Sequence, residues 1–274
     1  ETRDLVDHVT ALMGIVLFAV TLIGVVAAPY IIYISAPGFL DNPQKFSLTV
    51  ELLQITFPYI LFISFVSLAG GVLNTFGRFS VPAFTPALLN LSFIGCALWL
   101  APLLDPPILA LAWAVFIGGA LQLIFQLPFL MRVRLLPRPR LISNDTGAWR
   151  VVKQMGPAVF GASAGQISLL LSTIFASFLI TGSVSWLYYA DRLMEFPAGL
   201  LGVALGTVLL PTLSRHYTSN STEKYSHLLD WGLRFAVMMT LPAAVALSLL
   251  ATPLITTLFH YGEFSVNDVL MTRN

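Results

Sequence analysis

The chain has 274 residues, of which 57% are hydrophobic and only 10% are charged, and its formal net charge is +1. A water-soluble domain carries roughly 25% charged residues, so this composition excludes an ordinary soluble protein. The near-neutral charge also argues against a nucleic-acid partner, and it makes the positions of the few charges the informative feature.

Seven apolar stretches are long enough to cross a bilayer as helices, which takes about 18 or more residues with few charges. None of them shows a polar stripe at a spacing of 3.6 residues, the pattern of a helix at the surface of a soluble protein. They cover residues 11–34, 50–74, 82–101, 107–130, 156–180, 184–211 and 235–259. The sequence therefore predicts an all-α, polytopic transmembrane helix bundle.

Lys and Arg residues outside these stretches are divided unequally between the two sides of the predicted bundle. The N-terminal tail and the connections after the second, fourth and sixth stretches hold eleven of them, and the opposite side holds only Lys45 and Arg273. The eleven are Arg3, Arg78, Arg132, Arg134, Arg138, Arg140, Arg150, Lys153, Arg215, Lys224 and Arg234. Because Lys and Arg are enriched in cytoplasmic loops, we expect the N-terminal end and the basic connection 132–155 to be cytoplasmic.

This basic linker separates four predicted spans from three. A short internal repeat crosses it: residues 27–31 (AAPYI) recur as residues 251–255 (ATPLI), with a glycine nine residues after each proline. A same-direction repeat after six spans is typical of transporters built from two parallel six-helix halves. We therefore expect a partial N-lobe at 1–131 and a partial C-lobe at 156–274, within a longer protein of which this chain is an internal piece.

The sixth apolar stretch contains three charged residues, Asp191, Arg192 and Glu195. A charge at the centre of a bilayer costs at least ~2.5–3.5 kcal/mol, so the cluster needs compensation. One interpretation is an ion pair between Arg192 and Glu195 that holds helices together. That pair still leaves one negative charge, and intramembrane ionisable groups generally face a water-filled cavity. We favour a binding site in which the planar guanidinium of Arg192 takes a phosphate through two parallel hydrogen bonds.

No enzyme signature is present in the sequence. It lacks a Gly-Lys-Ser/Thr phosphate loop, a His-Glu-x-x-His motif, paired cysteines and a Gly-x-Ser-x-Gly motif. We therefore predict no catalytic residue, no metal site and no cofactor, and a transporter rather than an enzyme. A membrane glycosyltransferase remains an alternative, but its catalytic carboxylate would lie in an extramembrane loop, where Asp41, Asp105 and Glu263 are isolated. A structural membrane scaffold would leave the charged cluster unexplained.

Four runs of the sequence carry a family resemblance. They are residues 54–60 (QITFPYI), 71–83 (GVLNTFGRFSVPA), 153–157 (KQMGP) and 188–197 (YYADRLMEFP). The chain resembles, over its whole length, the MurJ (MviN) family of bacterial lipid II flippases, which belongs to the multidrug/oligosaccharidyl-lipid/polysaccharide (MOP) exporter superfamily. Members of the family have fourteen helices, arranged as two six-helix lobes plus two. The resemblance therefore implies a MOP-type two-lobe transporter, of which about seven spans, helices three to nine, are present here.

The resemblance also implies a function. It implies that the protein moves lipid II, an undecaprenyl-diphosphate-linked disaccharide pentapeptide, across the bacterial inner membrane by alternating access, with lipid II and membrane lipids as its partners. Arg192 matches a cavity arginine thought to engage the diphosphate, and Asp191 and Glu195 match its acidic neighbours. Ser172 stands where many members carry an acidic residue linked to sodium, which favours membrane potential as the driving force. An exporter of another polyprenyl-linked oligosaccharide, or of a drug, remains the alternative.

Overall fold

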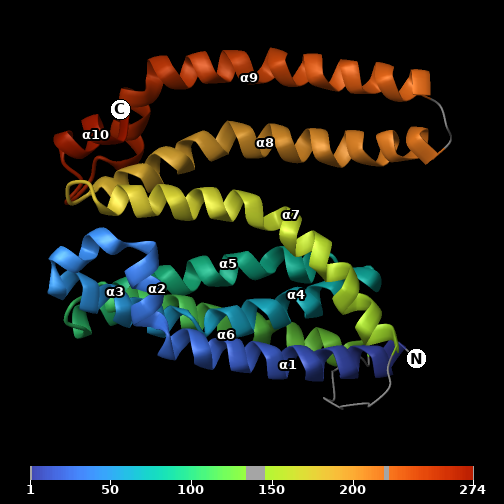
Figure 1. Ribbon diagram of the computed structural model, residues 1–274, viewed down its shortest axis with the longest axis horizontal. Helices are drawn as coiled ribbons and strands as arrows, with labels where there is room; N and C mark the ends of the chain where they lie inside the picture. The colour runs from blue at the N-terminus through green and yellow to red at the C-terminus, as the bar shows by residue number, and fades with distance from the viewer. Residues whose placement is uncertain (1, 134–145, 219–221, 274) are drawn as a thin grey trace. The chain divides into compact units, whose positions relative to one another are not determined.

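The described part of the protein is built of helices (Figure 1). This computed structural model describes the backbone of residues 2–133, 146–218 and 222–273. Within these ranges all regular elements are helical, which confirms the predicted all-α class. The chain divides into two compact units, which meet in sequence between Phe178 and Leu179.

The first unit is built around α6, which packs against α3, α4 and α5. Its elements are α1 (Thr2–Val26), α2 (Ala28–Ser35), η1 (Pro37–Asp41), α3 (Pro43–Thr56), α4 (Tyr59–Thr75), α5 (Ser80–Gly95), η2 (Cys96–Leu100), η3 (Ala101–Leu103), α6 (Leu109–Arg132) and α7 (Thr146–Ser177). Two adjacent glycines of α6 allow α5 and α4 to approach it closely. A Cβ on Gly118 would lie 2.6 Å from Leu89 Cδ1, and one on Gly119 would lie 2.7 Å from Tyr59 Cδ2. Small residues are used in this way at membrane helix interfaces.

Polar side chains add hydrogen bonds between α5 and α6. Gln122 Nε2 donates to the backbone carbonyl of Thr85 at 3.1 Å, and the fully buried Gln126 donates to Thr85 Oγ1 at 3.0 Å. Further along the same interface, Ser92 Oγ donates to the carbonyl of Ala114 at 2.8 Å. Such bonds hold membrane helices together where no hydrophobic force between helices is available.

The predicted span 11–34 is not a single straight helix, because it is interrupted between α1 and α2. Pro29 lacks a backbone N–H, so it cannot bond the carbonyl of Val25 four residues earlier. Gln54 of α3 replaces the missing donor: its Nε2 donates to the Val25 carbonyl at 3.3 Å. A side chain from a neighbouring helix thus satisfies the backbone group that the proline leaves open.

The predicted span 50–74 is interrupted in the same way, between α3 and α4, where Pro58 follows Phe57. The ring of Phe57 lies so close to Gly24 of α1 that a Cβ at that glycine would collide with it. The two interruptions therefore lie side by side. Neither could be located from hydropathy alone, since the apolar run continues through both prolines.

Replacing Gln54 by Ala is expected to destabilise the protein by about 0.6–1.7 kcal/mol, the range of interhelical hydrogen bonds in membranes. The penalty should shrink when Pro29 is also replaced by Ala, because the new N–H can then bond the Val25 carbonyl. Thermal unfolding of the four combinations in detergent measures this coupling. Gln44→Ala, at an exposed position of the same helix, is the control. An equal penalty with and without Pro29 would refute the compensation.

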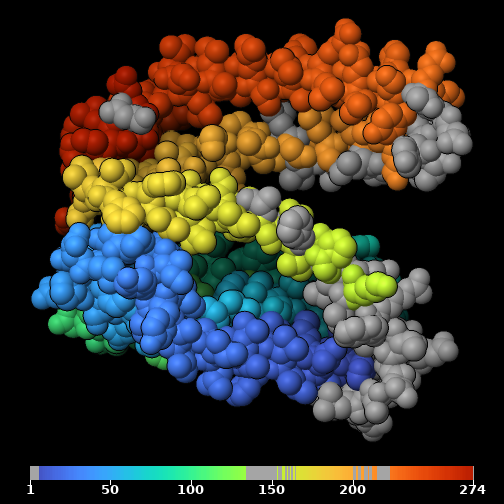
Figure 2. All heavy atoms as spheres, viewed as in Figure 1, coloured from blue at the N-terminus to red at the C-terminus, as the bar shows by residue number. Residues whose placement is uncertain are grey.

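Each of the seven predicted spans coincides with helix over most of its length. In the described part of the chain, five helical stretches are long and apolar enough to cross a membrane: Val6–Val26, Pro43–Thr75, Ser80–Leu103, Leu109–Arg132 and Glu223–Phe259. In the last of these, no residue of the most apolar window is buried, and Figure 2 shows its side chains (orange to red) on the surface. Exposed apolar area on this scale suits lipid rather than water. The chain is a multi-pass membrane protein.

The basic linker 132–155 overlaps the start of α7. Residues 134–145 lie outside the described part of the chain, but from Thr146 the backbone is helical and runs directly into the fifth predicted span. The second half of the linker is therefore continuous with the predicted span. Figure 1 shows that α7 is bent, as expected for a helix that contains Pro157.

The end of α7 is held by η1. Gly38 of η1 donates its backbone N–H to Ser177 Oγ at 3.2 Å. Through its contacts with α1, α2 and η1, α7 groups with the helices that precede it. The lobes predicted at 1–131 and 156–274 were inferred from the sequence repeat. That division of the chain stays a prediction.

The second unit consists of α8 (Ser183–Thr218), α9 (Thr222–Phe259) and α10 (Val266–Arg273), with α10 packed against both longer helices. α8 has 36 residues and α9 has 38. At 1.5 Å per residue they are about 54 and 57 Å long, so both extend beyond a hydrocarbon core of about 30 Å. The sequence repeat has a structural counterpart. Both α2 and α9 end six residues after the repeated proline, at Ser35 and Phe259.

Candidate functional site

The charged cluster lies in the first half of α8, whose start is fixed by a tight turn. Gly182 has a φ of +110°, a value that L side chains rarely adopt, and the ring of Trp186 covers it. The Trp186 indole then donates from Nε1 to Asp268 Oδ1 of α10 at 2.7 Å. The beginning of α8 is thus tied to the beginning of α10.

Asp268 also caps its own helix. Its Oδ2 accepts hydrogen bonds from the backbone N–H and the hydroxyl of Ser265, at 2.7 and 2.6 Å, and its N–H faces Ser265 Oγ at 3.3 Å. This reciprocal arrangement is a capping box. The hydrogen bonds from Ser265 and from Trp186 hold the pKa of Asp268 below its ordinary value. The carboxylate is therefore ionised at neutral pH, and its bond to Trp186 is charge-assisted.

Aromatic packing sets the rotation of α8 about its axis. The ring centroid of Tyr189 lies 4.7 Å from that of Phe259 at the end of α9, and 5.2 Å from that of Phe264 just before α10. Both distances fall in the range of favourable aromatic pairs. With Tyr189 held on one side, the preceding residue, Tyr188, is directed elsewhere and is 54% exposed.

Tyr188, Asp191, Arg192 and Glu195 form one stripe on α8, within about 100° of its circumference at 3.6 residues per turn. The Arg192 guanidinium carbon lies 4.9 Å from the centre of the Tyr188 ring, a cation–π distance. Arg192 Nη1 donates to Glu195 Oε2 at 2.6 Å. The guanidinium is therefore held on its face by a ring and on one nitrogen by a carboxylate.

The side chains of the stripe are open rather than buried between helices. Those of Arg192 and Glu195 are 55% and 65% exposed, and Asp191 is partly buried. The Arg192–Glu195 pair joins two residues of the same helix, so it does not connect α8 to α9 or α10. This geometry disfavours the interpretation of the cluster as a clamp between helices.

The orientation of the guanidinium matters for what it can bind. Glu195 contacts Nη1, which is not part of the edge formed by Nε and Nη2. That edge carries two parallel N–H groups, the arrangement that takes phosphate or carboxylate oxygens in a bidentate contact. Arg192 can thus keep its partner within the helix and present a fork to an anion.

Two parts of this arrangement were not predicted from the sequence. Tyr188 stands four residues before Arg192, and this i,i+4 spacing of an aromatic and an arginine was the available signal. The Trp186–Asp268 bond had no sequence signal, since it joins residues 82 positions apart.

Two predictions from the sequence concern ions: the absence of a metal site, and the absence of sodium coupling inferred from Ser172. In the ranges that the structure describes, no three His, Cys, Asp or Glu residues lie together as a metal site would require. Ser172, the residue behind the prediction on sodium, is a partly buried residue of α7 in the first unit. Membrane potential as the driving force of transport stays a prediction.

Comparison with known proteins agrees with the resemblance noted in the sequence. The chain matches the family model described as "Lipid II flippase MurJ" over residues 1–274. It is 47% identical over 270 residues to the probable lipid II flippase MurJ of Buchnera aphidicola subsp. Acyrthosiphon pisum, a match that covers 98% of this chain and 53% of the relative. It is 46% identical over 274 residues to the lipid II flippase MurJ of Burkholderia cenocepacia, with the same two coverages.

A solved structure is also similar. It is titled "Lipid II flippase MurJ, inward closed conformation", and the match has a TM-score of 0.78 at 24% identity, over 98% of this chain and 55% of the other. This likeness, together with the family match, confirms the predicted MOP-type fold. The chain spans about half the length of the relatives that it matches. Through a match along its entire length, the chain belongs to the lipid II flippase MurJ family.

Proposed function

We propose that the chain forms part of a flippase, a transporter and not an enzyme, that moves lipid II from the inner to the outer leaflet for cell-wall synthesis. The observation that carries this proposal is the exposed Arg192 guanidinium within the predicted span 184–211, oriented by Tyr188 and Glu195. The relatives are named as lipid II flippases, which supports the choice of lipid II as substrate.

In this proposal Arg192 binds the diphosphate of lipid II through Nε and Nη2. A diphosphate is the part of the substrate that a guanidinium fork recognises best. Tyr188 keeps the fork facing outward through its ring. Glu195 and Asp191 limit how tightly the anion is held, because two carboxylates beside one guanidinium leave the site with a net charge of about −1. A carrier needs such moderate binding, since its substrate must also leave.

Movement across the membrane follows alternating access between the lobes predicted at 1–131 and 156–274. We place the protein in the bacterial inner membrane, with the N-terminal end and the basic linker 132–155 in the cytoplasm. Membrane potential, rather than sodium, drives the cycle in this proposal, because the uncharged Ser172 occupies the position of the acidic residue linked to sodium.

The test is complementation of cells depleted of their own lipid II flippase. The complete gene product should restore the outward movement of lipid II. Arg192→Ala should reduce it by about 30-fold or more, because the proposed contact between Arg192 and the diphosphate excludes water in the complex and truncating one partner of such a pair costs at least about 2 kcal/mol. Arg192→Lys keeps the charge without the fork and should fall between the two. Undiminished movement in Arg192→Ala would remove Arg192 from the site, and no movement by the unmodified protein would refute the function.

A further inference from the structure

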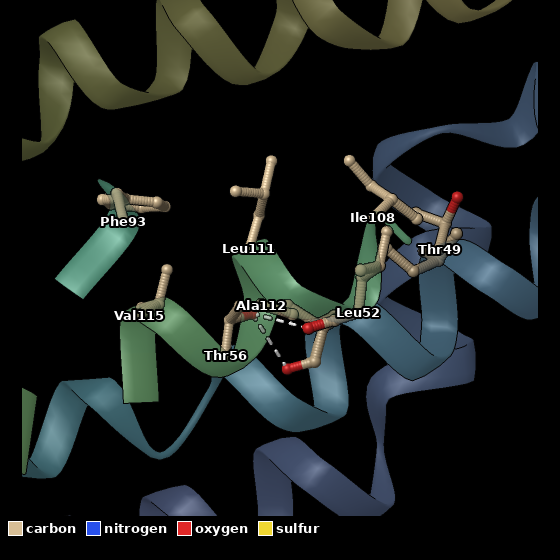
Figure 3. Close-up of a pocket in the computed structure, with 10 residues that line it drawn as sticks. Thr49, Leu52, Thr56, Phe93, Ile108, Leu111, Ala112 and Val115 are labelled. Carbon is tan, nitrogen blue, oxygen red and sulfur yellow. Dashed lines mark hydrogen bonds between the residues drawn. The ribbon is translucent and has the colours of Figure 1, made fainter. Parts of the chain in front are cut away.

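A second feature of the first unit is an apolar groove between α3, α5 and α6, with one side formed by α2 (Figure 3). Its volume is about 410 Å³. The side chains that form it include Ile32, Leu52, Phe93, Leu111 and Val115. Leu111 and Val115 project from the same side of α6 into the groove in Figure 3.

The two threonines of the groove do not make it polar. Thr49 Oγ1 donates to the Lys45 carbonyl at 2.7 Å, and Thr56 Oγ1 donates to the Leu52 carbonyl at 2.9 Å. Both hydroxyls are therefore satisfied by their own helix, as the dashed lines at Thr56 in Figure 3 illustrate. The groove offers hydrocarbon contacts and no polar group in need of a partner.

A groove with these properties suits a hydrocarbon chain. A cavity of about 150 Å³ lined by apolar side chains already holds benzene and stays dry, so about 410 Å³ has room for a longer segment. Leaving it empty would forfeit dispersion contacts along its whole lining. In a membrane-spanning unit, the surrounding bilayer supplies acyl chains to fill it.

A lysine lies on the groove face of α3, one turn before the first groove residue. Lys45 and the groove residues Thr49, Leu52 and Thr56 follow one another at intervals of four, three and four residues. All four therefore lie on one face of α3. Lys45 lies near the beginning of α3, with Nζ 4.0 Å above the ring of Phe39. Glu51 lines a separate hollow on another face of the helix. The face of α3 that lines the apolar groove therefore also carries a lysine, one turn before the first groove residue.

We propose that this groove binds an anionic phospholipid, with one acyl chain between α3 and α6 and the phosphate at Lys45. Charge complementarity selects the headgroup, because a lysine at the membrane surface attracts anionic lipids over zwitterionic ones. The apolar lining accepts the chain without regard to the headgroup. The site belongs to the first unit and shares no residue with the Arg192 cluster.

The test uses the complete gene product in nanodiscs made with either phosphatidylglycerol or phosphatidylcholine, each carrying a photoreactive diazirine in its acyl chain. Peptides from α3 and α6 should be labelled about five-fold more by phosphatidylglycerol, which corresponds to one lysine near the surface. Lys45→Gln should remove this preference. Leu111→Trp should fill the groove and lower labelling by both lipids, whereas Ile124→Trp, at an exposed position of α6 outside the groove, should not.

Several results would overturn the proposal. Equal labelling by the two lipids, or labelling that Leu111→Trp leaves unchanged, would mean ordinary contact with bulk lipid. Stronger labelling by a photoreactive polyprenyl phosphate than by phosphatidylglycerol would assign the groove to a prenyl chain. Crosslinks to a second protein copy in place of lipid would make it a protein interface. Thermal unfolding verifies that each variant is folded, and the partly exposed Lys45→Gln keeps the test decisive if Leu111→Trp fails to fold.

Discussion

Exchanging the two partners of the ion pair, as Arg192→Glu with Glu195→Arg, is expected to reduce lipid II movement by about 30-fold or more while leaving stability almost unchanged. The pair can form again within the same helix, and an acidic residue that precedes a basic one is the more favourable order. The guanidinium, however, moves about 4.5 Å along the helix axis and loses the ring of Tyr188 beneath it. Its fork then no longer faces the diphosphate.

This exchange separates two roles that a single substitution confuses. If the cluster served only to neutralise charges in the membrane, the exchanged pair would do so equally well and transport would persist. Movement of lipid II in depleted cells and thermal unfolding of the purified protein are the two measurements. Tyr188→Phe, which keeps the ring, is the matched control and should retain most of the transport. Near-normal transport by the exchanged protein would refute a positional role for Arg192.

Gly38→Ala is expected to destabilise the first unit by about 1–3 kcal/mol. A Cβ at this position would collide with the carbonyl of Ser177 and lie 2.7 Å from the backbone nitrogen of Phe178. These are backbone atoms, so they cannot rotate aside as a flexible side chain would. Either the end of α7 or the turn η1 must shift, and the bond from Gly38 N–H to Ser177 Oγ is lost with it.

Thermal unfolding in detergent measures this effect, and a chain of this size should lose roughly 2–10 °C of unfolding temperature. Gly71→Ala is the control, because it is the same substitution within α4, one turn before its end, with no atom near the added methyl group. Alanine is the better helix former there, so stability should hold or rise by up to about 1 kcal/mol. Similar unfolding temperatures for the two variants would mean that the end of α7 is not held tightly by η1.

The interruptions between α1 and α2 and between α3 and α4 show which features of the helices hydropathy predicts and which it does not. Bilayer-length apolar runs predict the helices because an unpaired backbone group is too costly in lipid. They do not predict which prolines interrupt a helix, because that depends on whether a neighbour satisfies the freed carbonyl. Gln54 does so for Val25 from 29 positions away. The sequence showed both residues but not their contact.

For the charged cluster, too, some features follow from the sequence and others only from the tertiary structure. The sequence by itself determined that Asp191, Arg192 and Glu195 share a region of one membrane helix, since a charge in an apolar run is visible without coordinates. Only the tertiary structure decided how the guanidinium is aimed, because that depends on α8 being rotated by Tyr189 against α9 and α10. The same holds for the groove near Lys45. Its walls come from four helices, and no single stretch of sequence encodes the space between them.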